Sequence, residues 1–257
     1  MKAIILAAGY ATRLFPLTKK IPKPLIKIGN KLMIEHVLEK ILEIDINDIY
    51  IVTNEIFTKQ FEEWANNYPN KEINIEIIND GTTSNDDRLG AIGDINFTID
   101  KANLDTDLLI IGGDNLFKFS LDNAKFLFTT QNKPTIVGHD VKNIELAKKY
   151  GVIEVDNHKK VLSFIEKPSE PRSTFCAICV YFYPKEYIKV IKKYLDEGNN
   201  PDAPGNLPAW LVKNDEVYAE TYTEPWYDVG GFESLKEAKE AFGEEDVDIE
   251  KLKKGIL

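Results

Sequence analysis

The stretch KAIILAAGYATRLFPLTKKIPKPL, residues 2–25, determines the architecture of this chain. Its apolar opening, residues 2–8, is too short for the core of a signal peptide, so it predicts a buried strand. A polar loop that begins at Gly9 follows at once. Ligands of open parallel sheets bind at the carboxyl ends of the strands, so this loop is a candidate binding site.

Strand and helix patterns alternate through the rest of the first half. Apolar residues at positions 33, 34, 37, 38, 41 and 42, for example, follow the spacing of a helix. The alternation predicts an α/β fold with a mostly parallel sheet and helices on both faces. The predicted strands are 49–53, 73–78, 108–111 and 135–138, and the predicted helices are 33–44, 57–68, 89–102 and one that closes at 126–130.

The second half of the chain is richer in strands. The patterns at 151–155, 161–165 and 175–183 follow one another closely, which predicts a small antiparallel insert. Helices are predicted at 185–197 and 207–212, a late strand at 217–223, and a charged helical tail at 233–257. We therefore expect one α/β domain over residues 1–240 and a charged helical C-terminal extension over residues 241–257.

Composition narrows the classes of partner. The net charge of −10 disfavours nucleic acid and anionic membranes. No apolar run approaches the ~20 residues of a membrane span. The two cysteines, Cys176 and Cys179, cannot form a disulfide framework, so a cytoplasmic protein is expected. Three residues apart on a strand, they point to opposite faces, which predicts plain core cysteines rather than a redox or metal site.

The distribution of charge is more specific than its total. No acidic residue precedes Glu35, and the stretch before it holds seven basic residues: Lys2, Arg13, Lys19, Lys20, Lys23, Lys27 and Lys31. A solvated basic face is the commoner cause of such a run, but glycine and proline are interspersed here. Gly9 permits close approach to a phosphate, Arg13 offers a planar fork, and Lys23 stands between two prolines. The loop therefore predicts a site for a nucleoside triphosphate, although it lacks the P-loop signature.

Two carboxylates at strand ends indicate a metal site. Asp114 follows a buried strand and two glycines, and Asp228 follows the late strand. Magnesium prefers one or two carboxylates, several waters and the phosphates of its substrate. We therefore expect Mg²⁺ at Asp114 and Asp228. The three histidines are scattered and show no zinc-ligand spacing.

These residues resemble the signature of a known family. The pattern LAAG…TRL…PLT…PKPL, residues 6–25, is similar to the N-terminal motif of the nucleotide-sugar pyrophosphorylases, which are the sugar-1-phosphate nucleotidylyltransferases. Shorter matches follow in the family's order at 89–90, 113–114, 166–168 and 226–230. The resemblance covers residues 1–240, and its first motif is the long and specific one.

The resemblance implies a Rossmann-like fold and the transfer of a nucleotidyl group from an NTP to a sugar 1-phosphate, with release of pyrophosphate. Magnesium would be the cofactor, and family frequency alone favours dTTP or UTP and glucose 1-phosphate. Arg13 and Lys23 would be catalytic and hold the triphosphate. The implied nucleotide-binding residues are Leu6, Ala8, Gly9, Thr12, Arg13, Lys23, Asn79, Gly81, Leu89, Gly90 and Asp114. The implied sugar-phosphate residues are Gly151, Glu166, Lys167 and Asp228. The oligomeric state stays open, a homo-oligomer included.

Two departures from the family pattern matter. The family usually has glycine where this chain has Ala11. A left-handed backbone there would cost alanine about 1–2 kcal/mol, whereas an ordinary conformation would cost nothing. Many members also carry a glutamine near the start of the base-facing segment, and none can be placed in residues 79–90. The identity of the base is therefore open.

Three alternatives remain. A glycosyltransferase would use a D-x-D motif after a strand, but Asp105-Thr106-Asp107 precedes strand 108–111, and the second match, 246–248, lies in the charged tail. A phosphocholine or other non-sugar cytidylyltransferase would need an aromatic cage, for which the candidates are Tyr150, Trp210, Tyr222, Trp226 and Tyr227. A non-catalytic nucleotide-binding regulatory homologue should have lost a cation or a carboxylate, and Arg13, Lys23, Asp114, Lys167 and Asp228 are all present.

Overall fold

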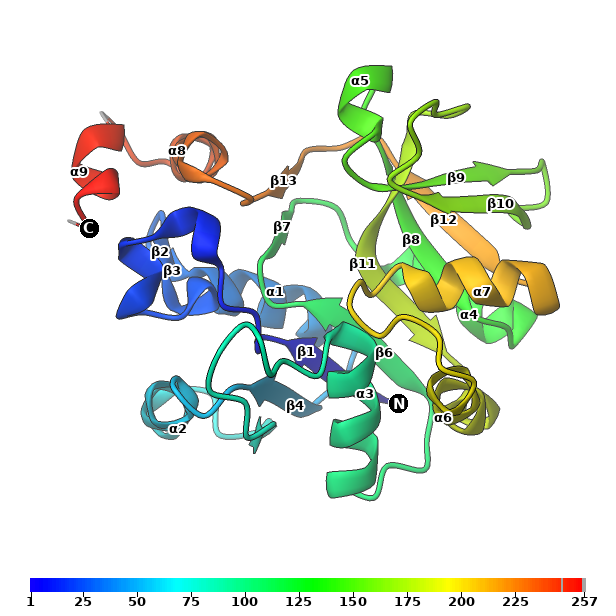
Figure 1. Ribbon diagram of the computed structural model, residues 1–257, viewed down its shortest axis with the longest axis horizontal. Coiled ribbons are helices and arrows are strands. Elements are labelled where there is room, and N and C mark those ends of the chain that lie inside the picture. Colours follow the sequence, from blue (N-terminus) through cyan, green and yellow to red (C-terminus); the bar gives the residue numbers. More distant parts are fainter. Residues whose placement is uncertain (246, 256–257) are drawn as a thin grey trace.

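A mixed sheet runs through the centre of the computed structural model, which describes residues 1–245 and 247–255 (Figure 1). Its strands are β1 (Lys2–Leu6), β4 (Asp48–Thr53), β5 (Asn74–Asn79), β6 (Leu108–Gly112), β8 (Thr135–Asp140), β9 (Gly151–Val155), β10 (Val161–Glu166), β11 (Phe175–Tyr183) and β12 (Tyr218–Tyr222). They follow the order β10-β9-β11-β6-β1-β4-β5, with β8 paired to β11 and β12 paired to β8. Every predicted strand is present close to its expected position.

The direction of the strands changes at β11. Strands β6, β1, β4 and β5 are parallel to one another, as are β8 and β12. Strand β11 runs antiparallel to β6, β8 and β9, and β9 and β10 form an antiparallel pair. The predicted α/β fold with a small antiparallel insert is confirmed. The insert continues the main sheet, because β11 belongs to both.

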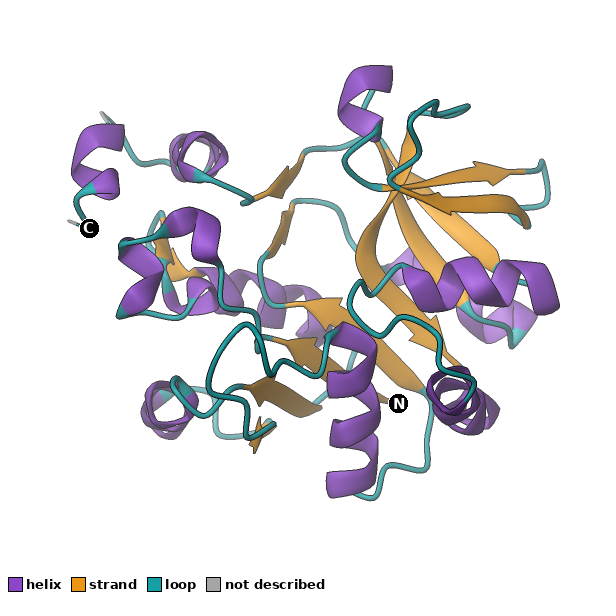
Figure 2. Cartoon of the chain, in the orientation of Figure 1, coloured by secondary structure: helices purple, strands orange, loops and turns teal. Residues whose placement is uncertain are grey.

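Helices cover both faces of the sheet (Figure 2). Helices α1 (Met33–Leu42), α2 (Thr58–Asn67) and α4 (Asp122–Gln131) pack on the face that includes Ile5. Helices α3 (Ala91–Lys101), α6 (Ile188–Asp196) and α7 (Asn206–Asn214) pack on the face that includes Ile4. Successive residues of a strand point to opposite faces, so β1 is buried on both sides. No helix in the described part of the chain could cross a membrane.

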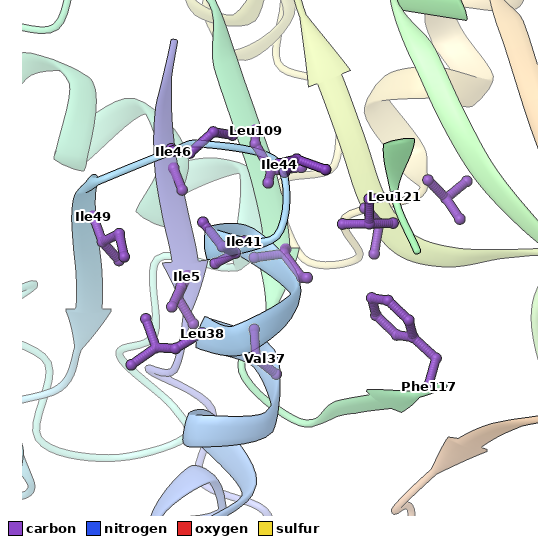
Figure 3. Close-up of a cluster of buried hydrophobic side chains, with 14 of the residues drawn as sticks. Ile5, Val37, Leu38, Ile41, Ile44, Ile46, Ile49, Leu109, Phe117 and Leu121 are labelled. Carbon is purple, nitrogen blue, oxygen red and sulfur yellow. The ribbon is translucent and has the colours of Figure 1, made fainter. Parts of the chain in front are cut away.

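Helix α1 shows why the sequence folds this way. Its residues Val37, Leu38 and Ile41 repeat at the helical spacing and are fully buried. They pack toward Ile5 and Ile49 of the sheet (Figure 3). Full burial of each such side chain contributes roughly 1.5–3 kcal/mol, so this face fixes the helix against β1. The carboxyl end of β1 and the loop that follows it are thereby held in place.

The C-terminal tail packs on that loop. In the predicted helical tail, 233–257, the structure has two helices, α8 (Phe232–Ala241) and α9 (Ile249–Lys253). Gly243 follows the end of α8 and has a φ of +93°, a left-handed conformation that glycine adopts readily. This glycine accounts for the interruption between α8 and α9. Leu235 and Leu252 are buried in one cluster with Leu14 of the first loop. Of the predicted extension over 241–257, residues 246 and 256–257 lie outside the described residues, as does the first residue of the 246–248 D-x-D match.

Two short strands were not predicted from the sequence. Strand β7 (Asn115–Phe117) and strand β13 (Trp226–Asp228) form an antiparallel ribbon in which Asp228 pairs with Asn115. The other unpredicted elements are β2 (Lys27–Ile28), β3 (Lys31–Leu32) and α5 (Ile144–Ala147). The ribbon brings the segment after β12 back to the end of β6. It thereby places Asp228 close to Asp114.

The two cysteines differ in their surroundings. The register of β11 against β8 shifts between Ala177 and Tyr181, and Cys179 takes a left-handed φ of +56° within this bulge. Cys176 is buried, as expected of a core cysteine, but Cys179 is only partly buried. Cys179 still packs against the hydrophobic core, although the bulge interrupts the strict alternation on which the expectation of opposite faces rested.

Ala11 adopts the left-handed conformation, with φ of 45° and ψ of 44°. Its carbonyl oxygen accepts a hydrogen bond of 2.8 Å from the Thr18 hydroxyl, which holds the loop in this shape. Of the two possibilities left by the sequence, the strained one is therefore the one observed.

We predict that Ala11→Gly stabilises the protein. Relief of the left-handed strain is worth about 1–2 kcal/mol, and the greater freedom of glycine in the unfolded chain offsets about 0.5–1 kcal/mol of it. Urea unfolding should show a net gain of roughly 0.5–1 kcal/mol. The matched control is Ala65→Gly within helix α2, which should lose about 1 kcal/mol. If Ala11→Gly lowered the free energy of unfolding as much as the control does, Ala11 would not be strained in a left-handed conformation.

Candidate active site

Two adjoining cavities lie where the loops after β1, β5 and β6 converge. The α3 cavity, of about 350 Å³, is bounded by the first loop, by the segment after β5 and by the start of helix α3. The β11 cavity, of about 460 Å³, is bounded by strands β9, β10 and β11. Asp114, Cys179 and Pro204 line both cavities. The predicted convergence of polar segments at the carboxyl ends of the strands is therefore what the structure shows.

Lys23 and Asp114 form an ion pair beside the junction of these cavities. Gly113 makes this possible, since a Cβ on it would lie only 3.1 Å from the Leu6 oxygen and 3.2 Å from Cγ of Pro24. The close approach brings the Nζ of Lys23 to 2.5 Å from Oδ2 of Asp114. Removal from water alone raises the pKa of Asp114, but the charge and hydrogen bond of Lys23 bring that pKa below its ordinary value.

Asp228 reaches the same place through the β7–β13 ribbon. Its partner in the ribbon is Asn115, the residue directly after Asp114. Burial raises the pKa of Asp228, and the neighbouring charge of Asp114 raises it further. The charges of Lys23 and Arg13 and a hydrogen bond with the Tyr150 hydroxyl offset this only in part. The two carboxylates are thus close enough to repel each other.

This pair fits a divalent cation. The raised pKa of Asp228 shows that the cations present do not fully balance the two carboxylates. Oxygen ligands of this number suit magnesium, which keeps several waters and binds substrate phosphates. Asp114 and Asp228 are therefore the residues that would hold Mg²⁺, and their role as its ligands stays a prediction.

Arg13 lies near Asp228. The position that a Cβ on Gly230 would occupy is 3.4 Å from Nη1 of Arg13 and 3.5 Å from Oδ2 of Asp228, so both side chains lie beside Gly230. Arg13 lines the β11 cavity and also a third cavity of about 600 Å³, the α8 cavity, which extends toward helix α8. Two cations, Arg13 and Lys23, thus flank two carboxylates.

Glu166 and Lys167 lie at the far end of the β11 cavity. A Cβ on Gly205 would lie 2.5 Å, and one on Gly151 2.8 Å, from Oε2 of Glu166, so both glycines make room for this carboxylate. Burial raises the pKa of Glu166, while the charge of Lys167 lowers it. Lys167 has a left-handed φ of +47°, and its main-chain N–H donates to the main-chain carbonyl oxygen of Tyr150. Its exposed ammonium group lies 3.8 Å from Oε1 of Glu166, a long ion pair that leaves room for an anion to approach.

A second carboxyl pair, Asp80 and Asp94, lines the α3 cavity. Both side chains are buried, and the two form a hydrogen bond with each other. Asp80 also accepts the N–H of Thr82 at 2.7 Å. Burial and the charge of Asp80 raise the pKa of Asp94 to about 8, so Asp94 holds the shared proton at neutral pH.

The structure brings most of the predicted site residues to the cavities. Leu6, Ala8, Gly9, Gly90 and Asp114 line the α3 cavity, and Arg13, Gly151, Glu166, Lys167 and Asp228 line the β11 cavity. Thr12, Lys23, Asn79, Gly81 and Leu89 line neither, although Lys23 pairs with the lining residue Asp114. The roles of all the predicted residues in binding stay predictions. The Asn79 side chain is instead engaged by Glu55 and by the Gly81 N–H.

The sequence analysis placed Asp80, Asn85 and Arg88 only within the base-facing segment and Tyr150 and Trp226 only among the candidates for an aromatic cage, and all five line the cavities. Other lining residues were missed altogether: Asp94, Asn115, Lys149, Cys179, Asp202, Pro204 and Gly205. Asp94 had a detectable signal, because it lies within the buried stripe of helix α3. The D-x-D residues Asp105 and Asp107 lie before β6 and bind Lys185, away from both cavities.

The model of the nucleotidyl transferase family matches residues 2–245. A protein of Sulfolobus acidocaldarius with the provisional name mannose-1-phosphate guanyltransferase is 29% identical over 230 residues, which cover 90% of this chain and 60% of that protein. The bifunctional protein GlmU of Methanocaldococcus jannaschii is 27% identical over 230 residues, 90% of this chain and 51% of that protein. The chain thus spans between half and three fifths of the length of these relatives.

Solved structures show the same fold. A protein of Bacillus anthracis provisionally named glucose-1-phosphate thymidylyltransferase, solved with sucrose, superimposes with a TM-score of 0.83 at 23% identity, covering 96% of both chains. The UDP-glucose pyrophosphorylase of Acinetobacter baumanii gives a TM-score of 0.76 at 19% identity, covering 96% of this chain and 95% of that one. The expected Rossmann-like fold is confirmed.

We predict that Asp94→Asn stabilises the protein at alkaline pH. The folded pKa of Asp94, about 8, lies above its ordinary value of 3.8. Folding is then most favourable at low pH, and stability falls as the pH rises from about 4 to about 8, because the unfolded chain loses this proton first. Asparagine cannot ionise, so at pH 8 the free energy of unfolding of the variant should exceed that of the unchanged protein by about 1–3 kcal/mol.

The measurement is urea unfolding of both proteins at pH 5 and pH 8. The gain of the variant should be large at pH 8 and small at pH 5. An equal difference at the two pH values would mean that Asp94 does not hold the proton.

Proposed function

Because this chain belongs to the nucleotidyl transferase family, we propose that it transfers a nucleotidyl group from an NTP to a sugar 1-phosphate and releases pyrophosphate. The observation that supports this best is the meeting of two cations and two carboxylates, Arg13, Lys23, Asp114 and Asp228, beside two adjoining cavities. One cavity can hold a nucleoside, the other an acceptor, and the charged cluster a triphosphate with its metal.

Each part of the cluster has a task in this reaction. An oxygen of the sugar phosphate would attack the α-phosphorus in line, and pyrophosphate would leave. Arg13 and Lys23 would neutralise charge that grows on the phosphate oxygens, and Lys167 would draw the acceptor phosphate toward the junction. Magnesium, held by Asp114 and Asp228, would supply further charge neutralisation when bound. Glu166 would accept hydrogen bonds from sugar hydroxyls.

Membership of the family does not by itself identify the base of the NTP or the sugar of the acceptor. Family frequency favours dTTP or UTP with glucose 1-phosphate. The names of the relatives, however, include a guanyltransferase, a thymidylyltransferase and a UDP-glucose pyrophosphorylase. The choice of base therefore has to rest on the chemistry of the cavity that would hold it.

A phosphocholine acceptor is the second candidate, and one observation favours it. Tyr150 and Trp226 meet edge to face at 5.1 Å and line the α8 cavity together with Glu233 and Glu237. Aromatic faces and carboxylates are what a quaternary ammonium group prefers. Of the other candidates for a cage, Tyr227 lines this cavity, but Trp210 packs on Tyr194 and Tyr222 on Phe119. The sugar remains favoured because Glu166 and Lys167 face the cavity beside the metal-binding pair.

The experiment is pyrophosphate release from the purified protein with Mg²⁺. Five triphosphates, dTTP, UTP, CTP, GTP and ATP, are combined with several sugar 1-phosphates and with phosphocholine. Release that requires both substrates establishes the reaction and identifies the acceptor. Nucleotide binding without release for every acceptor would instead support a regulatory homologue.

We predict that Arg13→Ala and Asp114→Asn each lower kcat/KM by about a hundredfold. Loss of one group that stabilises developing charge costs roughly 3 kcal/mol. The matched control for Arg13 is Lys20→Ala, which removes an exposed cation from the same loop and should leave kcat/KM within about twofold of normal. Thermal unfolding should confirm that all three variants fold. Near-normal turnover of Arg13→Ala or Asp114→Asn would refute the site.

We also predict that Asp228→Asn raises the Mg²⁺ concentration needed for half-maximal activity. The variant keeps the shape of the side chain but supplies one negative charge fewer to the cation. A rise of about tenfold or more is expected, as for the loss of a group that supports a metal. The readout is activity against Mg²⁺ at saturating substrates, and an unchanged requirement would exclude Asp228 as a ligand.

A further inference from the structure

Lys149 is the cation of the β11 cavity whose charge no carboxylate balances. Arg13 and Lys167 also line this cavity. The charge of Arg13 acts on Asp228, whose pKa it lowers, and the ammonium group of Lys167 lies 3.8 Å from Oε1 of Glu166. In the part of the chain that the structure describes, residues 1–245 and 247–255, no carboxylate lies within ion-pair distance of the Lys149 ammonium. Its charge is therefore available to a ligand.

The main chain holds Lys149 beside Lys167. Strands β9 and β10 pair at Gly151 and Glu166, so the pairing stops where β9 begins and β10 ends. One step beyond this end, the main-chain N–H of Lys167 donates to the carbonyl oxygen of Tyr150 at 3.0 Å. Lys149 directly precedes Tyr150. The two lysines thus lie on adjacent segments at the end of the hairpin that faces the β11 cavity.

Lys149 also lies at the border of a second cavity. It lines the α8 cavity as well as the β11 cavity, whereas Lys167 lines only the β11 cavity. Its neighbour Tyr150 lines both, and the Tyr150 hydroxyl forms a hydrogen bond with Asp228. An acceptor in either cavity can therefore meet the Lys149 ammonium close to the carboxylate that would hold magnesium.

Two lysines on one side of a cavity suit a phosphate monoester. Such a group carries about two negative charges at neutral pH. Lys167 alone would balance at most one of them, and Lys167 shares its charge with Glu166. Hydrogen bonds from an ammonium group to phosphate oxygens are charge-assisted and are stronger than neutral ones. Lys149 supplies the second positive charge that the phosphate requires.

We propose that Lys149 is a substrate-binding residue that holds the phosphate of the acceptor together with Lys167. This inference rests on the proposed function, because the acceptor of that reaction is a phosphate monoester. The phosphate lies at the border of the two cavities, and the rest of the acceptor extends into one of them. A sugar extends into the β11 cavity beside Glu166, and a quaternary ammonium group extends into the α8 cavity beside Trp226.

The first test is the KM for the acceptor in Lys149→Ala. Loss of a charge-assisted hydrogen bond should raise this KM about tenfold. The kcat and the KM for the NTP should stay within about twofold of normal, because only binding of the acceptor is weakened. Lys149→Arg keeps the charge and should recover most of the affinity. Thermal unfolding checks that each variant folds.

Lys148→Ala is the matched control. Lys148 is the neighbouring lysine, but it pairs with Glu145 at 2.7 Å and lines neither cavity. All kinetic constants of this variant should stay within about twofold of normal. A KM for the acceptor that is the same in Lys149→Ala and Lys148→Ala would overturn the proposal.

Lys167→Ala separates the two sources of the phosphate. For a sugar 1-phosphate in the β11 cavity, Lys149→Ala and Lys167→Ala should both raise the KM. For phosphocholine in the α8 cavity, which Lys167 does not line, the rise should be clearly larger in Lys149→Ala. Either result supports Lys149, whereas a rise in Lys167→Ala alone would refute it.

Binding of inorganic phosphate separates this inference from the proposed function. Calorimetry without nucleotide should show that Lys149→Ala binds phosphate about tenfold more weakly than Lys148→Ala does. If no acceptor supports pyrophosphate release, the proposed function fails, but this difference in affinity still establishes an anion site at Lys149. Absence of both release and such a difference would overturn both proposals.

Discussion

The pairing of two three-residue strands, β7 and β13, fixes the geometry of the candidate site. It sets Asp228 opposite Asn115 and so beside Asp114, although the two carboxylates come from distant parts of the chain. A ribbon this short is not stable alone. It is held by Leu116, which is buried with Val229, and by the Trp226 N–H, which donates to Asn115. Packing thus supports a pair of like charges that only cations can balance.

The bulge in β11 is hydrogen-bonded to the β7–β13 ribbon. The amide of Asn115 donates to the carbonyl oxygens of Ile178 and Cys179, which ties the bulge to the ribbon. Cys179 thereby lies at the boundary of the α3 and β11 cavities. Burial raises the pKa of its thiol, so the group is neutral there. The boundary between the cavities is thus formed by two uncharged residues, Cys179 and Pro204, and by the carboxylate of Asp114.

The fold was predictable from the sequence, whereas half of the site was not. Buried strands such as β1 and amphipathic helices such as α1 have strong periodic patterns, and Asp114 follows from its place after a strand. The sequence indicated that Asp228 and Asp114 both lie at strand ends, but strands β7 and β13 are too short to show a period, so the ribbon that brings the two together was not predicted. Asp80 has the appearance of a turn residue. Its partnership with Asp94 depends on how β5 and helix α3 come together, which is tertiary information.

For the proposed substrate, the arrangement of charge in the site favours one direction of binding. The cations Arg13 and Lys23 lie at one end; at the other lie the carboxyl groups of Asp80 and Asp94, and Arg88, which lines the same cavity, is paired with Asp202. A triphosphate placed in the α3 cavity would meet acceptors that repel it, and a base placed at the junction would leave the cations unpaired. Reversed binding is therefore unfavourable at both ends. An acidic protein can bind a polyanion in this way, because the attraction is local and the repulsion elsewhere helps to orient the ligand.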